Sequence, residues 1–252
     1  STRGSSTRSS KLPSRSGAGS RLPRRGRRAI AGGEAPRAVA RRRWLTYALL
    51  GAALPLAAQP REQGAFRTPD LVELVRLDST IRLDIRYATA DNFMKRPMYA
   101  EARAFLQRPA AMALLRAGRR LAPLGFGLLV KDAYRPWSIT KKFWDETPPA
   151  KRAFVANPAR GSKHNRGCAV DCTLYELATG KEVRMPSAYD EFSPRAAARY
   201  AGGTPAERKL RDLLITTMAS GGFTVDSGEW WHFDYKDWKY YRVLDIPFDQ
   251  IR

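Results

Sequence analysis

The chain has 252 residues, 43% hydrophobic and 27% charged, values ordinary for a globular protein, and its length suits one domain behind an N-terminal extension. Its formal charge of +21 is unusual but uneven, because residues 1–58 hold thirteen Lys or Arg residues and a single acid. No aromatic residue precedes Trp44, so this basic segment lacks side chains on which bases could stack, and we expect no nucleic-acid partner.

The first 58 residues are predicted to lie outside the folded domain. Residues 1–40 are rich in Ser, Arg, Gly, Pro and Ala without apolar periodicity, which predicts a disordered basic tail. Residues 41–58 begin with three arginines, continue with an apolar run and end in small residues, as a secretory signal peptide does; the paired arginines also suggest twin-arginine export. The run is shorter than the roughly 20 residues of a membrane span.

Cleavage near Ala57 or Ala58 would leave residues 59–252 as the mature domain. We therefore expect an exported, periplasmic protein with no stable membrane anchor after cleavage. The alternative is an uncleaved amphipathic N-terminal helix, with which a cytoplasmic location would be compatible.

The first half of this domain contains a strand, a helix and a second strand. Residues 81–86 alternate apolar and charged side chains, which predicts a half-buried strand, and residues 87–93 follow as a loop. Residues 109–121 have Pro in the first turn and arginines towards the end, which favours a helix with Met112, Leu114, Leu115 and Leu121 on its apolar side. Gly125 lies where a helix exit often needs a positive φ.

The second half supplies the remaining strands and helices. The apolar run 126–130 predicts a central strand that delivers Asp132 and Arg135 at its end. We expect short helical structure over 139–145, a strand over 168–174, a helix over 205–220, and a hairpin formed by 223–226 and 230–235. The elements do not repeat as βαβ units. The fold class predicted is α+β: a single domain with a central, mainly antiparallel sheet flanked by helices, and a metal site on the sheet.

Cys168 and Cys172 are the only cysteines. On an extended segment they would lie about 13 Å apart, beyond the reach of a disulfide. Their spacing also matches no usual zinc pattern, so two buried free thiols are expected.

Both histidines of the chain lie in short polar segments. His164 precedes Asp171 by seven residues, and His232 follows Glu229 by three. Three protein ligands with an open position for water are typical of catalytic zinc, which leaves a fourth group free to move protons. The composition of these segments therefore predicts a zinc hydrolase.

The geometry of these segments requires a bend. Residues an odd number apart point to opposite faces of a straight strand, so His164 and Asp171 can meet only if the chain turns at residues 165–167. Likewise Glu229 must lie in a turn or bulge before a strand that carries His232. Each residue also has a structural interpretation, since a single histidine is more often a hydrogen-bonded core residue, Asp171 could cap a turn, and Glu229 could pair with an arginine.

Four segments in order resemble the D-alanyl-D-alanine dipeptidases, the VanX type of zinc peptidase. Residues 162–171 fit the family motif Ser-x-His-x-x-Gly-x-Ala-x-Asp, and residues 229–232 fit its Glu-Trp-Trp-His motif. Residues 132–136 (Asp-Ala-Tyr-Arg-Pro) and 87–93 resemble further family signatures, and the likeness extends from about residue 71 to 248. The first motif alone would indicate only the wider group that includes D,D-carboxypeptidases and hedgehog-like domains.

The resemblance implies a role for each matching residue. It implies one Zn²⁺ held by His164, Asp171 and His232, with Glu229 as catalytic base and Arg135 as the cation facing the scissile carbonyl. It further implies that Asp190, with Tyr87, binds the substrate ammonium and that Ser162 binds near the carboxylate end. Residues 94–99 are compressed relative to the family pattern, so no role is assigned to Tyr99.

The function expected is zinc-dependent hydrolysis of free D-alanyl-D-alanine to two D-alanines, in wall-peptide turnover or glycopeptide resistance, with this small dipeptide as the partner molecule. A D,D-carboxypeptidase acting on peptidoglycan stem peptides is the nearest alternative. A non-catalytic zinc module that binds wall peptides is another, although such a module needs neither a proton-transferring Glu229 nor an oxyanion-binding Arg135.

Overall fold

The computed structural model describes residues 58–252. The predicted disordered tail of residues 1–40 lies outside the described residues, and so does the predicted signal peptide, residues 41–58, apart from its last residue. Within the described part, no helix is both long enough and apolar enough to cross a membrane.

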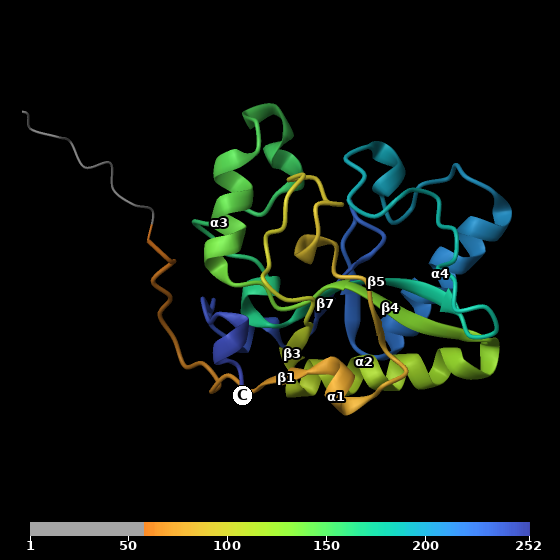
Figure 1. The fold of residues 1–252 in the computed structure, drawn as a ribbon, viewed down its shortest axis with the longest axis horizontal. Helices are drawn as coiled ribbons and strands as arrows, with labels where there is room; N and C mark the ends of the chain where they lie inside the picture. Colours follow the sequence, from red (N-terminus) through yellow and green to blue (C-terminus); the bar gives the residue numbers. More distant parts are fainter. Residues whose placement is uncertain (1–57) are drawn as a thin grey trace, which may run out of the picture. The chain divides into compact units, whose positions relative to one another are not determined.

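A five-stranded sheet forms the centre of the domain (Figure 1). Its strand order is β2-β4-β5-β7-β6; β2 pairs with β4 in parallel and every other neighbour pair is antiparallel. A separate two-stranded sheet joins β1 to β3. The strands are β1 (Leu71–Glu73), β2 (Arg82–Leu83), β3 (Phe105–Gln107), β4 (Phe126–Asp132), β5 (Ala169–Glu176), β6 (Phe223–Val225) and β7 (His232–Tyr235). The predicted α+β class with a mainly antiparallel sheet is confirmed.

Helices lie on both sides of the sheet: α2 along one face, and α3 with several loops over the other (Figure 1). The helices are α1 (Leu74–Leu77), α2 (Arg108–Leu121), α3 (Trp137–Glu146) and α4 (Pro205–Ser220). Helix α4 starts at a capping box, in which Thr204 and Glu207 each satisfy a backbone N–H of the other. Short 3₁₀ turns also occur at Arg86–Ala88, Ala122–Leu124, Pro149–Phe154, His164–Arg166, Pro194–Ala196, Trp238–Tyr240 and Phe248–Gln250.

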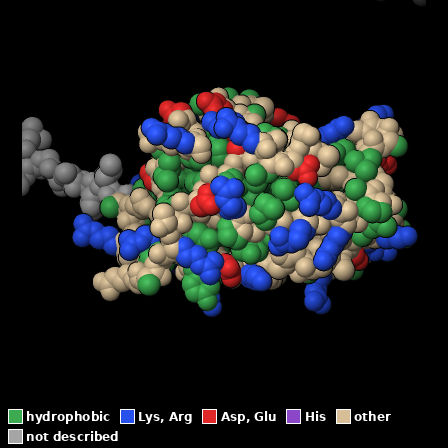
Figure 2. Space-filling model, turned by 90° about the horizontal axis from the view of Figure 1, so that it is seen from below, with side chains coloured by type: hydrophobic (Ala, Val, Ile, Leu, Met, Phe, Trp, Pro, Cys, Tyr) green, Lys and Arg blue, Asp and Glu red, His purple; other side chains and the backbone are tan. Residues whose placement is uncertain are grey.

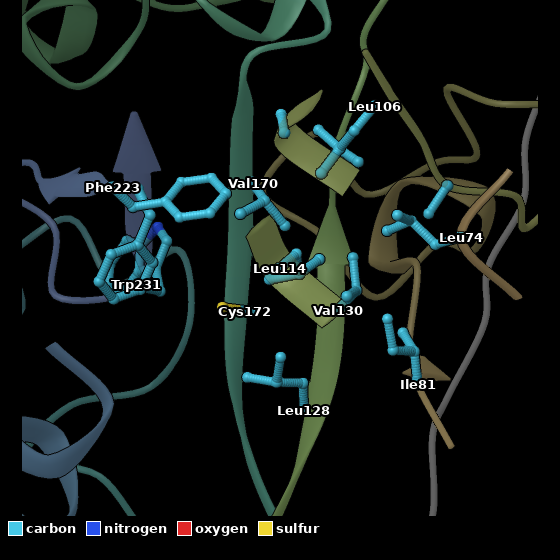
Figure 3. Close-up of a cluster of buried hydrophobic side chains, with 14 of the residues drawn as sticks. Leu74, Ile81, Leu106, Leu114, Leu128, Val130, Val170, Cys172, Phe223 and Trp231 are labelled. Atoms are coloured by element: carbon cyan, nitrogen blue, oxygen red, sulfur yellow. The ribbon is translucent and has the colours of Figure 1, made fainter. Parts of the chain in front are cut away.

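The two faces of the sheet differ in chemistry. Alternate residues of β4 and β5 project onto α2, where Leu128 and Val130 pack with Val170 and Cys172 around Leu114 (Figure 3). These side chains are nearly or completely buried. The intervening residues of β5 and β7 point to the opposite face, which leaves that face for polar side chains.

Most predicted elements are present, and two details are wrong. Residues 81–86 form a strand only at Arg82–Leu83, because the chain leaves β4 after Asp84 and turns into the 3₁₀ segment Arg86–Ala88. Met112 is 39% exposed and does not lie on the apolar side of α2, which faces the core through residues such as Leu114, Leu115 and Leu121. The alternation of residues 81–86 reflects the burial of Ile81 and Ile85, not an extended strand.

Two further predictions are confirmed. Gly125 has a φ of 85° and ends the 3₁₀ turn that follows α2. Cys168 and Cys172 are both free and buried, and burial raises the pKa of both thiols, that of Cys168 to about 12, which favours their protonated forms at neutral pH.

The outward side of α2 is basic, with Arg116, Arg119 and Arg120 all exposed. Figure 2 views the domain from this side and shows more Lys and Arg than Asp and Glu side chains, spread among apolar ones. This face lies across the sheet from the polar face described next.

Candidate metal centre and active site

The three predicted metal ligands come together on the polar face of the sheet. Asp171 of β5 and His232 of β7 are directly opposed in the antiparallel register, which brings their side chains close. His164 lies in the 3₁₀ turn before β5, and Gly167, with a φ of 66°, reverses the chain direction between them. The bend expected at residues 165–167 therefore exists, and it allows His164 and Asp171 to face one point.

The geometry of this triad fits a tetrahedral metal ion. His164 Nε2 lies 3.1 Å from His232 Nδ1 and 3.3 Å from Asp171 Oδ1, and the latter two atoms are 3.1 Å apart. Ligands at about 2.0–2.1 Å from a tetrahedral ion lie about 3.3 Å from each other, so these three atoms form one face of such a site. Among the described residues, this triad is the group of His, Cys, Asp or Glu side chains that lie close enough together to hold a metal ion.

Each histidine is oriented by a partner on its other nitrogen. His164 Nδ1 lies 2.6 Å from the carbonyl oxygen of Ala133, and His232 Nε2 lies 3.0 Å from Asp234 Oδ1. If each of these nitrogens carries the proton and donates to its oxygen, the opposite nitrogens, His164 Nε2 and His232 Nδ1, direct free lone pairs towards the metal position. The carboxylate of Asp234 is in turn 3.1 Å from Lys163 Nζ.

Glu229 lies beside the triad without joining it. It occupies the turn before β7, as its odd spacing from His232 requires, and its Oε2 is 3.9 Å from His232 Nδ1. Burial raises the pKa of Glu229 to about 7, helped by the negative charge of Asp171, although 28% of the side chain remains exposed. A carboxylate with this pKa next to the triad is suited to proton transfer.

Arg135 is held in the site by Asp132. A bulge between Val130 and Asp132 interrupts the β4–β5 register, and Asp132 Oδ2 accepts hydrogen bonds from Arg135 Nε at 3.0 Å and Nη2 at 2.6 Å. The other oxygen of Asp132 accepts from the Tyr99 hydroxyl at 2.8 Å. Tyr99, to which the sequence assigned no role, thus supports the carboxylate behind Arg135.

The three predicted substrate-binding residues line the same cavity. Asp190 Oδ2 accepts a hydrogen bond from the Tyr87 hydroxyl at 2.8 Å. Burial, and secondly the charge of Asp171, raise the pKa of Asp190 well above its usual range, so a cation is needed to stabilise its ionised form. Ser162 Oγ accepts from the backbone N–H of His164 at 3.1 Å, which places its side chain next to the triad.

Aromatic side chains to which no sequence motif assigned a role also line the cavity. The cavity measures about 80 Å³, and its apolar lining comes from Phe93, Phe143, Phe154 and Phe192. The rings of Phe154 and Phe192 are stacked, with centroids 4.9 Å apart and an angle of 5° between the ring planes. The stack connects two segments that are distant in sequence. A second cavity of about 430 Å³ adjoins the triad and shares Ser162, Glu229 and His232 with the first.

Comparison with known proteins places the chain among dipeptidases by sequence. Residues 67–247 match the Peptidase_M15 family, described as D-ala-D-ala dipeptidase. The D-alanyl-D-alanine dipeptidase of Escherichia coli (strain K12) is 33% identical over 181 residues, covering 72% of this chain and 92% of that protein. That of Enterococcus faecalis (strain ATCC 700802 / V583) is 35% identical over 186 residues, covering 67% and 88%.

Among solved structures, the vancomycin resistance D,D-dipeptidase VanXYg in complex with a D-Ala-D-Ala phosphinate analog is similar with a TM-score of 0.37 and 20% identity. The match covers 59% of this chain and 54% of that chain. A similarity at this level is too weak to bear on the site.

Proposed function

Since the chain belongs to the D-ala-D-ala dipeptidase family of metallopeptidases, we propose that it hydrolyses the free dipeptide D-alanyl-D-alanine to two D-alanines. The observation that carries the proposal is the convergence of the metal-ligand triad, Glu229 and Arg135 on one cavity. A structural metal site would have a fourth protein ligand and would need neither Glu229 nor Arg135.

Zinc is the metal we propose for the triad. Two imidazoles and one carboxylate are a known zinc ligand set of catalytic sites, in which the fourth position stays open. When bound, the ion would polarise a water molecule and the substrate carbonyl. The hydrogen bonds to Ala133 O and Asp234 already orient both imidazoles for this task.

Glu229 and Arg135 divide the remaining chemistry between them. Glu229, which lies beside the triad without joining it, would take a proton from the attacking water and pass it to the leaving amine. The Arg135 guanidinium, fixed by Asp132, donates to the carbonyl oxygen as negative charge develops on it. One well-placed donor of this kind contributes about 3 kcal/mol to transition-state stabilisation.

Substrate selection follows from the walls of the cavity. Asp190 and Tyr87 are proposed to bind the free ammonium, and Ser162 the carboxylate end, which lies towards the second cavity. Phe154 and Phe192 line the same cavity as Asp190, and we propose that their stack leaves no room for a longer peptide on the amine side. This supports a dipeptidase over a carboxypeptidase that trims stem peptides.

Export to the periplasm is proposed from residues 41–58 alone. Cell fractionation with N-terminal sequencing of the recovered protein tests it. Recovery from the cytoplasm with residues 41–58 intact would contradict export and would favour action on a cytoplasmic dipeptide pool.

The test of function uses the purified full chain loaded with zinc. Incubation with L,L, L,D and D,D dipeptides and with an N-acylated stem peptide, each with and without chelator, should give hydrolysis of free D-alanyl-D-alanine only, and none after chelation. Glu229→Ala should retain zinc and lose turnover, whereas the matched control Glu176→Ala, an exposed residue of β5, should remain active. Preferential cleavage of the N-acylated peptide would instead identify a carboxypeptidase, and zinc binding without cleavage a non-catalytic module.

A further inference from the structure

Tyr189 binds the oxygen of Asp171 that faces away from the triad. Its hydroxyl donates to Asp171 Oδ2 at 3.0 Å, while Asp171 Oδ1 is the atom 3.1 Å and 3.3 Å from the two imidazole nitrogens. The two oxygens of this carboxylate therefore have separate partners, and only one of them is directed to the metal position.

The Tyr189 ring is fixed by aromatic neighbours. It packs edge-on against Trp231, with centroids 5.5 Å apart, and lies 6.4 Å from the ring of Tyr87. Trp231 is 1% exposed and directly precedes the ligand His232.

The backbone at the next residue allows two neighbouring side chains to enter the site. Asp190 has a φ of 57°, a left-handed conformation that is uncommon outside glycine. Tyr189 contacts Asp171, and Asp190 contacts the Tyr87 hydroxyl, so one short loop reaches both the metal ligand and the proposed ammonium site. Two adjacent side chains of this loop therefore both enter the site.

We propose that Tyr189 is a positioning residue of the metal centre, whose hydroxyl keeps Asp171 bound to the metal through Oδ1 alone. A carboxylate with a free second oxygen can rotate and bind a cation through both oxygens. That change would occupy the position that a catalytic zinc site keeps open for water and substrate. The inference rests on the metal site of the proposed function but not on which peptide is cleaved.

Tyr189→Phe tests the inference because it removes the hydroxyl and keeps the ring. With Co²⁺ in place of Zn²⁺, we expect the visible absorption of the variant to lose intensity, since a five-coordinate ion absorbs less than a tetrahedral one. Competition with a chelator should show zinc affinity lowered roughly 10-fold, the low end of the range for loss of a partner that orients a ligand. Turnover should fall through kcat with KM nearly unchanged.

Two tyrosines serve as matched controls. Tyr87→Phe removes the hydroxyl on Asp190 but leaves Asp171 untouched, so it should raise KM without changing the Co²⁺ spectrum. Tyr175→Phe removes a hydroxyl that donates to Thr80 O elsewhere in the fold, and should change neither property. X-ray absorption of the zinc-loaded wild type gives a further measurement that needs no variant, and should find a single carboxylate oxygen at bonding distance.

The outcomes separate this inference from the proposed function. A Tyr189→Phe protein with wild-type spectrum and zinc affinity, or a wild type with both Asp171 oxygens bound, would overturn the inference alone. Metal binding without peptide hydrolysis would contradict the dipeptidase proposal and leave the role of Tyr189 standing. A wild type that binds neither Zn²⁺ nor Co²⁺ would overturn both.

Discussion

Replacing Glu229 by Gln should stabilise the metal-free protein by much more at pH 8 than at pH 5. Burial raises the folded-state pKa of Glu229 from the usual 4.5 to about 7, so the fold disfavours its ionised form. Well below pH 4.5 the carboxyl is protonated in both folded and unfolded states, and no penalty exists. As the pH rises the unfolded chain ionises first, so the penalty grows and is complete above about pH 7.

The size of the penalty follows from the shift. Each pKa unit corresponds to about 1.4 kcal/mol, so the full shift would destabilise the ionised protein by about 3 kcal/mol. Because 28% of the Glu229 side chain reaches solvent, which screens part of the effect, we expect a gain of about 1–3 kcal/mol for Glu229→Gln at pH 8.

Urea unfolding of chelator-treated wild type and variant at both pH values measures the free energy of unfolding directly. Glu176→Gln provides the control for loss of an exposed carboxylate. With zinc bound, the gain should shrink, because the positive ion favours ionised Glu229. Equal effects of Glu229→Gln at pH 5 and pH 8 in the metal-free protein would refute the assigned cause.

Three further predictions concern residues around the triad. Arg135→Lys should lower kcat/KM about 100-fold with zinc affinity unchanged, because one ammonium cannot replace the two guanidinium contacts to Asp132. Steady-state kinetics and chelator competition measure the two quantities, and weakened zinc binding would contradict this prediction. Asp234→Ala should lower zinc affinity about 10–100-fold, because the His232 imidazole loses the partner that orients it, and unchanged affinity in chelator competition would refute this. Phe192→Ala should break the stack with Phe154 and raise the cleavage rate of N-acetylated dipeptide relative to the free one; an unchanged ratio would show that the stack does not exclude longer substrates.

The sequence was sufficient for parts of the site that depend on local geometry. The convergence of His164 and Asp171 requires only a reversal before a strand, and a glycine at position 167 makes that reversal available. The position of Glu229 in a turn follows from strand alternation once His232 is assigned to a strand. Such arguments work because side-chain direction along a strand has a period of two.

Other parts of the site depend on contacts that no local pattern encodes. The stack of Phe154 on Phe192 joins the end of a 3₁₀ segment to a loop 38 residues further along the chain, so tertiary packing decides that they meet. The hydroxyl of Tyr189 reaches Asp171 from a loop that contains a positive φ at Asp190, and no sequence pattern predicts the path of that loop. Asp234 is an intermediate case, because it lies two residues beyond His232 and thus on the same face of β7, a signal that strand periodicity offers.

The bulge in β4 explains how one strand serves both the core and the site. Up to Val130 the strand alternates regularly, and its apolar residues pack on α2. The irregularity between Val130 and Asp132 falls on Lys131, whose buried ammonium is 2.6 Å from Asp84 Oδ2 and 2.7 Å from Glu182 Oε2. Burial of this ammonium without partners would be strongly destabilising. The two carboxylates compensate its charge and so hold the extra residue in place. Asp132 is thereby placed opposite Asp171, where it can hold Arg135 towards the metal centre.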